Sequence, residues 1–310
     1  IVVLTVALFP LLGIGGTRLM GAESPGPTVD KVTPRVTDTA KILWTVYVLL
    51  TAAEIALLAA GGMNLLDAST HAFATMATGG FSTRNASVGA FDSAYVDIVV
   101  TVFMVLAGVN FALYWRIARG QIGAVSRDTE LKVYLGAVVV ATAVVAVDLV
   151  THAGMRTGQG IRYASFQAVS ILTTTGFVTA DYAAWPALSQ TVLFCLMFVG
   201  GCAGSTGGGI KVVRLTMLFR QAVVEMRYLV RPRGIFAVRL NGRAVRKNAI
   251  YGVYAFVFLY LVIIFATTLV VAGAGYDIVT SVTTSLATLG NIGPGFGRVG
   301  PASTYAHFPD

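Results

Sequence analysis

Long apolar runs alternate with short polar connections along most of the chain. A helix needs about 20 apolar residues to cross the roughly 30 Å hydrocarbon core of a membrane, and runs of this order predict spanning helices. The predicted spans are the tail of one that ends near Leu19, then Ile42–Gly61, Ala94–Trp115, Val133–Val150, Leu188–Gly200 with a continuation from Val212, and Ile250–Ala272. The pattern predicts an all-α, multi-pass integral membrane protein.

Three further apolar segments are too short to cross, which is typical of re-entrant or interfacial helices. They are Asp67–Ala77, Ile161–Thr173 and Asp277–Leu289. Because aspartate is a favoured residue at a helix N-cap, we expect Asp67 and Asp277 to cap their helices.

A glycine-rich tail follows each short segment: "MATGGFSTRNASVGAFD", "LTTTGFVTADYAAWP" and "ATLGNIGPGFGRVGP". Gly79, Gly176 and Gly293 head the three tails. The order of span, short helix, glycine-rich tail and next span therefore occurs three times, and such internal repeats define an architecture. One tail would be an ordinary loop, but three in the same context predict a shared role.

The basic residues indicate the orientation of the repeats. Most of the 22 lysine and arginine residues lie in three alternate connections: Arg18, Lys31, Arg35 and Lys41, then Arg116, Arg119, Arg127 and Lys132, then those between Lys211 and Lys247. The positive-inside rule makes these connections cytoplasmic, so all three tails face outward. Equal orientation predicts parallel repeats about an axis along the membrane normal, unlike the inverted repeats of many transporters.

The composition supports a membrane protein, and the placement of the basic residues decides how the net charge is interpreted. The chain is 56% hydrophobic and only 12% charged, whereas a soluble domain is nearer one quarter charged. The net charge of +8 could suggest nucleic acid, but its placement is a topology signal, so we expect no nucleic-acid partner. Cys195 and Cys202 fall in one apolar segment, and we interpret both as small buried hydrophobic residues, not as a disulfide or a metal site.

The tails have the chemistry of a cation filter. Non-helical backbone at membrane depth persists only where protein buries it or where it lines a water-filled path. Rings of backbone carbonyls from T-V-G-Y-G loops replace the hydration shell of potassium in known filters. Glycine permits the backbone angles this requires, and the negative C-terminal end of each short helix favours a cation. We expect no cofactor other than bound K⁺ as the transported ion.

The three tails supply the candidate filter residues, and only a central glycine is common to all of them. The residues are Ala77, Thr78, Gly79, Gly80, Thr174, Thr175, Gly176, Phe177, Asn291, Ile292, Gly293 and Pro294. The backbone carbonyls expected to hold potassium are those of Thr78, Gly79, Thr175, Gly176, Ile292 and Gly293.

The stretch "GGCAGSTGGGIKVVR" interrupts an apolar span. Each glycine costs a helix about 1 kcal/mol relative to alanine, so the segment can unwind and move. The candidate loop residues are Gly200, Gly201, Gly204, Ser205, Thr206, Gly207, Gly208, Gly209 and Lys211, with Ser205, Thr206 and exposed carbonyls facing water or an ion and with Lys211 and Arg214 near the cytoplasmic mouth. The alternative is a helix-packing patch of small residues.

This stretch does not match either of two enzyme motifs that it resembles, and we expect that the protein is not an enzyme. A phosphate-binding loop requires G-x-x-x-x-G-K-[ST], but Ile210 precedes Lys211 and Val212 replaces the hydroxyl. A nucleophile elbow requires G-x-S-x-G, and Ala203 stands where its first glycine should be.

Three polar residues lie within or near predicted spans, where such groups are functional candidates. We expect Glu54 to form a structural hydrogen bond or to take part in transport. We expect Asp148 to lie near the membrane interface and Asn110 to form a hydrogen bond between helices.

Six stretches together resemble the Trk/Ktr/HKT superfamily of potassium transporters, and bacterial TrkH-type subunits most closely. They are "PLLGIGG", "AESPGP", "GGFSTRNASVGAFDS", "LTTTGFVTADYAAWP", "GGCAGSTGGGIKVVR" and "NIGPGFG", in the order of the family. The single Asn291 departs from the paired asparagine that the family usually carries before its last filter motif.

The resemblance implies a fold of four parallel repeats, each a membrane helix, a re-entrant pore helix and a second membrane helix, around a central, potassium-channel-like pore. This chain would then hold the end of the last helix of repeat 1 (1–20), repeat 2 (39–118), repeat 3 (133–230, with an intramembrane loop at 200–211) and a truncated repeat 4 (249–310).

The resemblance also implies potassium uptake, by a channel-like or ion-coupled route, through a filter gated by that loop. It implies a homodimer in the bacterial inner (plasma) membrane and a cytoplasmic nucleotide-binding regulatory subunit of the TrkA type. The segment Arg227–Lys247 would be a docking surface for that subunit, or simply positive-inside charge. A sodium-conducting or sodium-coupled transporter on the same scaffold, and a non-transporting membrane scaffold, remain the alternatives.

Overall fold

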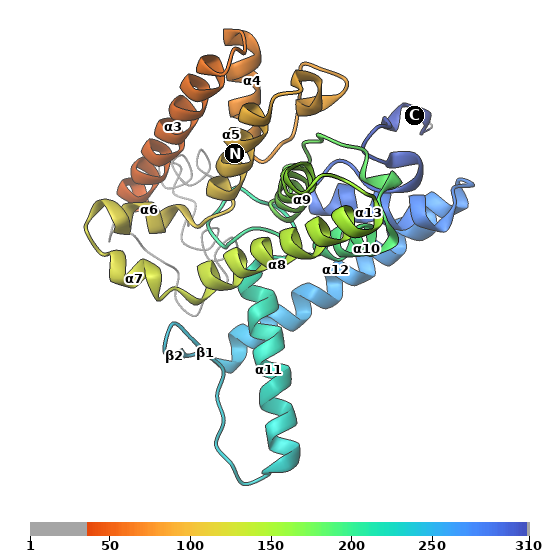
Figure 1. Cartoon of the computed structure of the whole chain (residues 1–310). Coiled ribbons are helices and arrows are strands. Elements are labelled where there is room, and N and C mark those ends of the chain that lie inside the picture. The colour runs from red at the N-terminus through yellow and green to blue at the C-terminus, as the bar shows by residue number, and fades with distance from the viewer. Residues whose placement is uncertain (1–35, 309–310) are drawn as a thin grey trace.

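The computed structural model describes residues 36–308, without the side chains of 36–40 and 307. The expected end of a repeat-1 helix (1–20), together with Arg18, Lys31 and Arg35, lies outside these residues. Helices dominate the fold (Figure 1). The helices and strands are α3 (Val36–Ala60), α4 (Leu65–Met76), η1 (Ser87–Phe91), α5 (Ala94–Ala107), α6 (Phe111–Ala118), α7 (Ile122–Ser126), α8 (Thr129–His152), α9 (Thr157–Leu172), η2 (Tyr182–Ala184), α10 (Ala187–Leu196), α11 (Val212–Val230), β1 (Arg239–Leu240), β2 (Arg243–Ala244), α12 (Lys247–Gly273), α13 (Ile278–Gly290), η3 (Gly297–Val299) and η4 (Tyr305–His307).

Within the described part of the chain, three helices are long and apolar enough to cross a membrane. They are Lys41–Ala60 of α3, all of α8 and all of α12. Helices α5 and α6 meet the same test only when taken together, and they are bent by 92° at the break between them. The predicted span over Ala94–Trp115 is therefore a sharply bent pair of helices and not one straight helix.

The break between α5 and α6 is built from a glycine and a capping asparagine. Gly108 ends α5, and the side chain of Asn110 accepts a hydrogen bond of 2.9 Å from the amide of Ala112 at the start of α6. Asn110 therefore caps α6, a helix of its own segment. This bond, and not the expected bond to another helix, positions its side chain.

The short helices α4, α9 and α13 pack against the long helices that precede them, α3, α8 and α12 respectively (Figure 1). The chain thus runs three times through a long helix, a short apolar helix and a loop, as the sequence predicts.

The caps of the short helices agree only partly with the sequence. Asp277 accepts a hydrogen bond of 3.0 Å from the amide of Thr280 and caps α13 as expected. On α4 the cap is Asn64, which accepts from the amide of Asp67 at 2.7 Å. The prediction that Asp67 caps this helix is wrong, because a second capping residue lies three positions earlier and takes the role.

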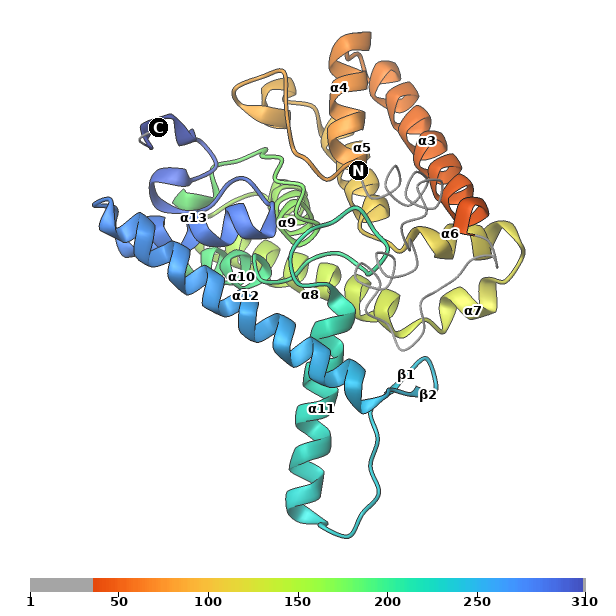
Figure 2. The same ribbon diagram turned by 180° about the vertical axis from the view of Figure 1, so that it is seen from behind.

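Helix α11 follows the glycine-rich loop and projects away from the other helices (Figures 1 and 2). The chain then returns through an antiparallel pair, β1 and β2, with Arg239 opposite Ala244, and enters α12. The helical continuation predicted from Val212 is present, but α11 carries Arg214, Arg220 and Arg227 and does not qualify as a span.

Two large apolar clusters hold the helices together. One centres on α8, α9, α10 and α13, and the other on α3, α4 and α5. Cys202 is buried in the first cluster, whereas Cys195 is exposed on α10, so the prediction that both cysteines are buried holds only for Cys202. Both thiols are free.

Candidate functional site

The three short helices end in the same way. One or two residues past each helical end, Thr78, Thr174 and Asn291 take left-handed backbone angles, with φ of 50°, 59° and 58°. Each of their amides donates to the carbonyl three residues earlier, and the next amide donates to the carbonyl five residues before it. Non-glycine residues rarely adopt this conformation, and its recurrence gives the three tails a common structural register.

That register corrects the alignment of the first tail. Two residues after each left-handed residue comes a glycine that also has a positive φ: Gly80 at 64°, Gly176 at 83° and Gly293 at 98°. Gly80 is therefore the counterpart of the other two, and the expectation that Gly79 plays this part is wrong by one residue. The sequence offers two adjacent glycines at this point, and only their backbone angles distinguish them.

The glycine-rich tails meet one another in chain order. A Cβ atom at Gly80 would overlap the carbonyl oxygen of Thr175 in the second tail. A Cβ at Gly176 would in the same way overlap the carbonyl oxygen of Ile292 in the third tail. The same pair of equivalent positions thus forms both contacts, which is the relationship expected for repeats placed around one axis.

Hydroxyl and imidazole groups of the short helices hold the outgoing part of each tail. Ser170 donates to the carbonyl of Phe177 at 2.7 Å, and Thr283 bonds with both the amide and the carbonyl of Phe296 at 3.0 Å. On α4, His71 Nε2 lies 2.9 Å from the hydroxyl of Ser82. The tails are therefore fixed by side chains and not only by their ends.

The glycine-rich loop 200–211 lies directly against the three helix ends. Thr78 donates to the carbonyl of Thr206 at 2.9 Å, and Thr174 accepts from the amide of Gly208 at 2.6 Å. A Cβ built at Gly208 would lie 3.4 Å from the Cβ of Asn291. Two of the left-handed residues thus bond with this one loop, and the third lies close to it at Gly208.

The other side of the loop rests on the break between α5 and α6. Cys202 donates its amide to the carbonyl of Gly108 at 2.9 Å, and Phe111 donates to the carbonyl of Gly204 at 3.0 Å. The Thr206 hydroxyl donates to the carbonyl of Ala107 at 3.2 Å. Two helix interruptions therefore satisfy each other's free backbone groups, which explains how both can persist in an apolar protein.

The polar side chains of the loop are used within the protein. Ser205 donates its hydroxyl to the carbonyl of Cys202 at 2.6 Å, and Thr206 bonds as above. Lys211 is buried, and its ammonium group donates to the carbonyl of Gly207. Arg214 stacks over the ring of Phe256, with Cζ 3.8 Å from the ring centroid. The Lys211 ammonium group is therefore buried and does not face solvent, whereas Ser205 and Thr206 are only half-buried, so their contact with water or an ion stays a prediction.

Glu130 is a site residue that the sequence reasoning missed. From the first turn of α8, one carboxylate oxygen accepts from the amides of Ala203 and Val213, at 2.7 and 3.1 Å. These amides lie inside the loop and just after it, so one side chain joins both parts. The only sequence signal was an acidic residue at the start of a predicted span, which ordinarily indicates a helix N-terminus.

A polar cluster surrounds Asp67 near the start of α4. Its carboxylate accepts from Thr83 at 2.5 Å, from Arg84 at 2.8 Å and from the Asn64 side chain at 2.9 Å. The Thr83 hydroxyl and the Arg84 guanidinium stabilise the charged form and lower the pKa of Asp67 below its usual value. The cluster fixes the first tail to the opposite end of its own helix.

Glu54 and Asp148 are both buried. Neither Glu54 oxygen accepts a hydrogen bond from the described residues, since the nearby Thr75 hydroxyl donates to the carbonyl of His71. Asp148, which the sequence predicts to lie near the membrane interface, is close to the end of α8, accepts from the amide and hydroxyl of Ser189 at 2.9 and 2.6 Å, and so ties α8 to α10.

The comparison with known proteins agrees with this geometry. The sequence model of a family described as TrkH, a cation transport protein, matches residues 1–310. The chain belongs to the TrkH family. It is 40% identical over 305 residues to the Trk system potassium uptake protein TrkH of Escherichia coli K12, and 41% identical over 302 residues to TrkG of the same strain.

These matches cover 96% of the chain but only 62% of each relative, so the chain spans less than two thirds of their length. Among solved structures, the potassium transporter TrkH from Vibrio parahaemolyticus superposes with a TM-score of 0.85 at 35% identity, over 99% of this chain and 63% of that one. The TrkH fold is therefore present throughout the described helices.

Proposed function

We propose that the protein takes up potassium across a bacterial inner membrane through a filter of backbone carbonyls, and that it is a transporter and not an enzyme. The observation that carries this proposal is the repeated contact of Gly80 with the Thr175 carbonyl and of Gly176 with the Ile292 carbonyl. The relatives named as Trk system potassium uptake proteins support potassium as the substrate.

The filter in this proposal follows the structural register. The carbonyls that hold K⁺ in place of water are those of Gly79 and Gly80, Thr175 and Gly176, and Ile292 and Gly293. Thr78 moves from this set to the underside of the filter, where its hydroxyl bonds with the loop. The C-terminal ends of α4, α9 and α13 add partial negative charge.

Loop 200–211 is the proposed gate. It contacts the ends of all three short helices, and its position is held by a hydrogen bond from the Thr78 hydroxyl and by bonds from its own amides to the Thr174 hydroxyl and the Glu130 carboxylate. Its six glycines let the segment change conformation at low cost.

A fourth loop, from the first repeat expected by resemblance, would complete the ring beside Gly293. Gly80 and Gly176 each lie against a following tail, whereas no described atom lies within 4 Å of a Cβ built at Gly293. The proposal also includes a homodimer, outward-facing filter loops and a cytoplasmic regulator of the TrkA type that acts near Arg227–Lys247.

Uptake of rubidium and sodium by bacteria that lack other potassium transporters tests this function. Potassium uptake predicts strong Rb⁺ uptake that K⁺ suppresses and Na⁺ does not. Deletion of Gly204–Gly209 should raise the flux in the absence of the regulator. No flux of either ion by the correctly folded protein would contradict transport, and equal flux of Rb⁺ and Na⁺ would contradict potassium selectivity.

A further inference from the structure

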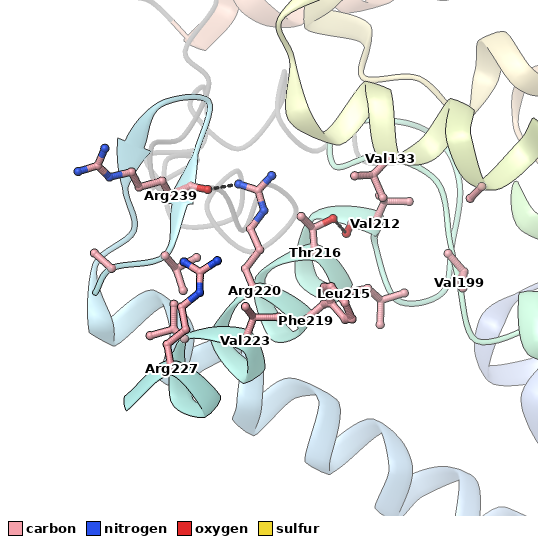
Figure 3. Close-up of a pocket in the computed structure, with 14 residues that line it drawn as sticks. Val133, Val199, Val212, Leu215, Thr216, Phe219, Arg220, Val223, Arg227 and Arg239 are labelled. Carbon is pink, nitrogen blue, oxygen red and sulfur yellow. Dashed lines mark hydrogen bonds between the residues drawn. The ribbon is translucent and has the colours of Figure 1, made fainter. Parts of the chain in front are cut away.

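A groove with a volume of about 780 Å³ lies between α8, α11 and the segment that enters β1. Figure 3 shows its apolar part, which includes Val133 of α8 and Leu215, Phe219 and Val223 of α11. The groove lies outside the filter and the loop, although part of its lining, including Arg227 and Arg239, falls within the segment Arg227–Lys247 proposed for the regulator.

Three arginines gather at one end of this groove. Arg220 and Arg227 come from α11 and Arg239 from β1, and Figure 3 shows all three on the same side of the apolar residues, with the Arg239 guanidinium directed away from the other two. Arg220 donates to the backbone carbonyl of Arg239, and this bond does not involve the Arg239 guanidinium. None of the described residues that line the groove is acidic.

The chemistry of the groove matches one class of molecule. We propose that it binds an anionic phospholipid, with the headgroup phosphate at Arg220, Arg227 and Arg239 and an acyl chain along the valine, leucine and phenylalanine side chains. Basic pockets beside membrane helices on the cytoplasmic side favour such headgroups, and a free phosphate would gain nothing from the apolar lining.

The groove also touches both ends of the candidate gate. Val199 and Val212 line it, and they flank loop 200–211 immediately before and after. Val199 forms a parallel bridge with Ile210, and Gly200 donates its amide to the carbonyl of Ile210 at 2.8 Å. A bound lipid therefore lies against the residues where the loop begins and ends.

Native mass spectrometry of the protein released from nanodiscs tests the proposal. The nanodiscs contain phosphatidylcholine with one fifth phosphatidylglycerol, and the number of molecules of each lipid that stay bound to the protein is counted. We expect retained phosphatidylglycerol in preference to phosphatidylcholine. The double variant Arg227→Gln/Arg239→Gln should weaken this retention about 25-fold, at about fivefold for each arginine near the membrane surface.

The matched control is Arg231→Gln/Arg233→Gln, which removes the same charge from two exposed arginines of the same connection that do not line the groove. It should retain the lipid as the parent does. Ala137→Trp, which fills the groove from α8, should lose the lipid while keeping all three arginines.

Three results would overturn the proposal. They are equal retention of both lipids, equal loss in the control and in the groove variant, and displacement of the lipid by soluble glycerophosphate at concentrations similar to those of the lipid. The last result would indicate a phosphate site in place of a lipid site.

Discussion

The hydroxyl of Thr78 donates a 2.9 Å hydrogen bond to the carbonyl of Thr206, which lies 128 residues further along the chain. The equivalent Thr174 accepts from the amide of Gly208 at 2.6 Å. The residue that ends a short helix thus also holds the glycine-rich loop, so the structure couples the filter and the proposed gate through single side chains.

Replacing both threonines by valine (T78V/T174V) should loosen the loop. Valine keeps the shape and the β-branch, so the cost of the left-handed backbone is unchanged while the two hydroxyls are lost. At about 1 kcal/mol for each hydrogen bond, we expect Rb⁺ flux without the regulator to rise roughly 5- to 30-fold. Thr267→Val is the control, because its hydroxyl bonds only within α12. Equal flux in the double variant and the control would contradict the coupling.

Gly80→Ala and Gly79→Ala should have very different effects. At Gly80 a methyl group would overlap the Thr175 carbonyl oxygen, and the φ is positive. At Gly79 its nearest neighbour is the exposed Phe81 side chain at 3.3 Å, and the Ala74 carbonyl oxygen lies at an ordinary contact distance of 3.8 Å. A left-handed alanine costs about 1–2 kcal/mol before any overlap, so Rb⁺ uptake should fall at least about tenfold in Gly80→Ala and stay within about twofold in Gly79→Ala. The reverse order would restore Gly79 as the counterpart of Gly176.

Glu130→Ala should release the loop and lower stability. Two amides lose their acceptor, at a cost of about 1–3 kcal/mol each when they stay buried. We expect a lower melting temperature in detergent and a higher basal flux, with Glu130→Gln intermediate because it keeps one oxygen. Glu225→Ala removes an exposed carboxylate that bonds only with Gln221, and should change neither quantity. A lower melting temperature with unchanged basal flux would show that Glu130 supports the fold but not the gate.

Asp67→Asn should lower stability at neutral pH but not in strong acid. Because the Thr83 hydroxyl and Arg84 lower the pKa of Asp67, the folded state keeps the carboxylate charged to lower pH than the unfolded state does. Its contribution is therefore complete above the unfolded pKa of about 3.9 and is lost as pH falls through the folded value. The difference in melting temperature between parent and variant should stay constant from about pH 8 to 5 and shrink below about pH 4. A difference that changes between pH 8 and 5 would indicate that another group is responsible.

The long helices and the three short helices could be predicted from the sequence because each follows from a local property, the length of an apolar run. The break at Gly108 could not, because it depends on bonds to a loop about a hundred residues away. For the same reason Glu130 looked like an ordinary acidic residue in a first helical turn, and the adjacent glycines 79 and 80 could not be told apart.

The sequence by itself determined that this protein is a bundle of membrane helices with three glycine-rich tails and one glycine-rich interruption, since hydropathy, charge placement and glycine content act locally. Only the tertiary structure decided which glycine of the first tail meets its neighbour, and which side chains hold the loop beneath. Those choices depend on backbone groups in different repeats that must satisfy one another where water is scarce.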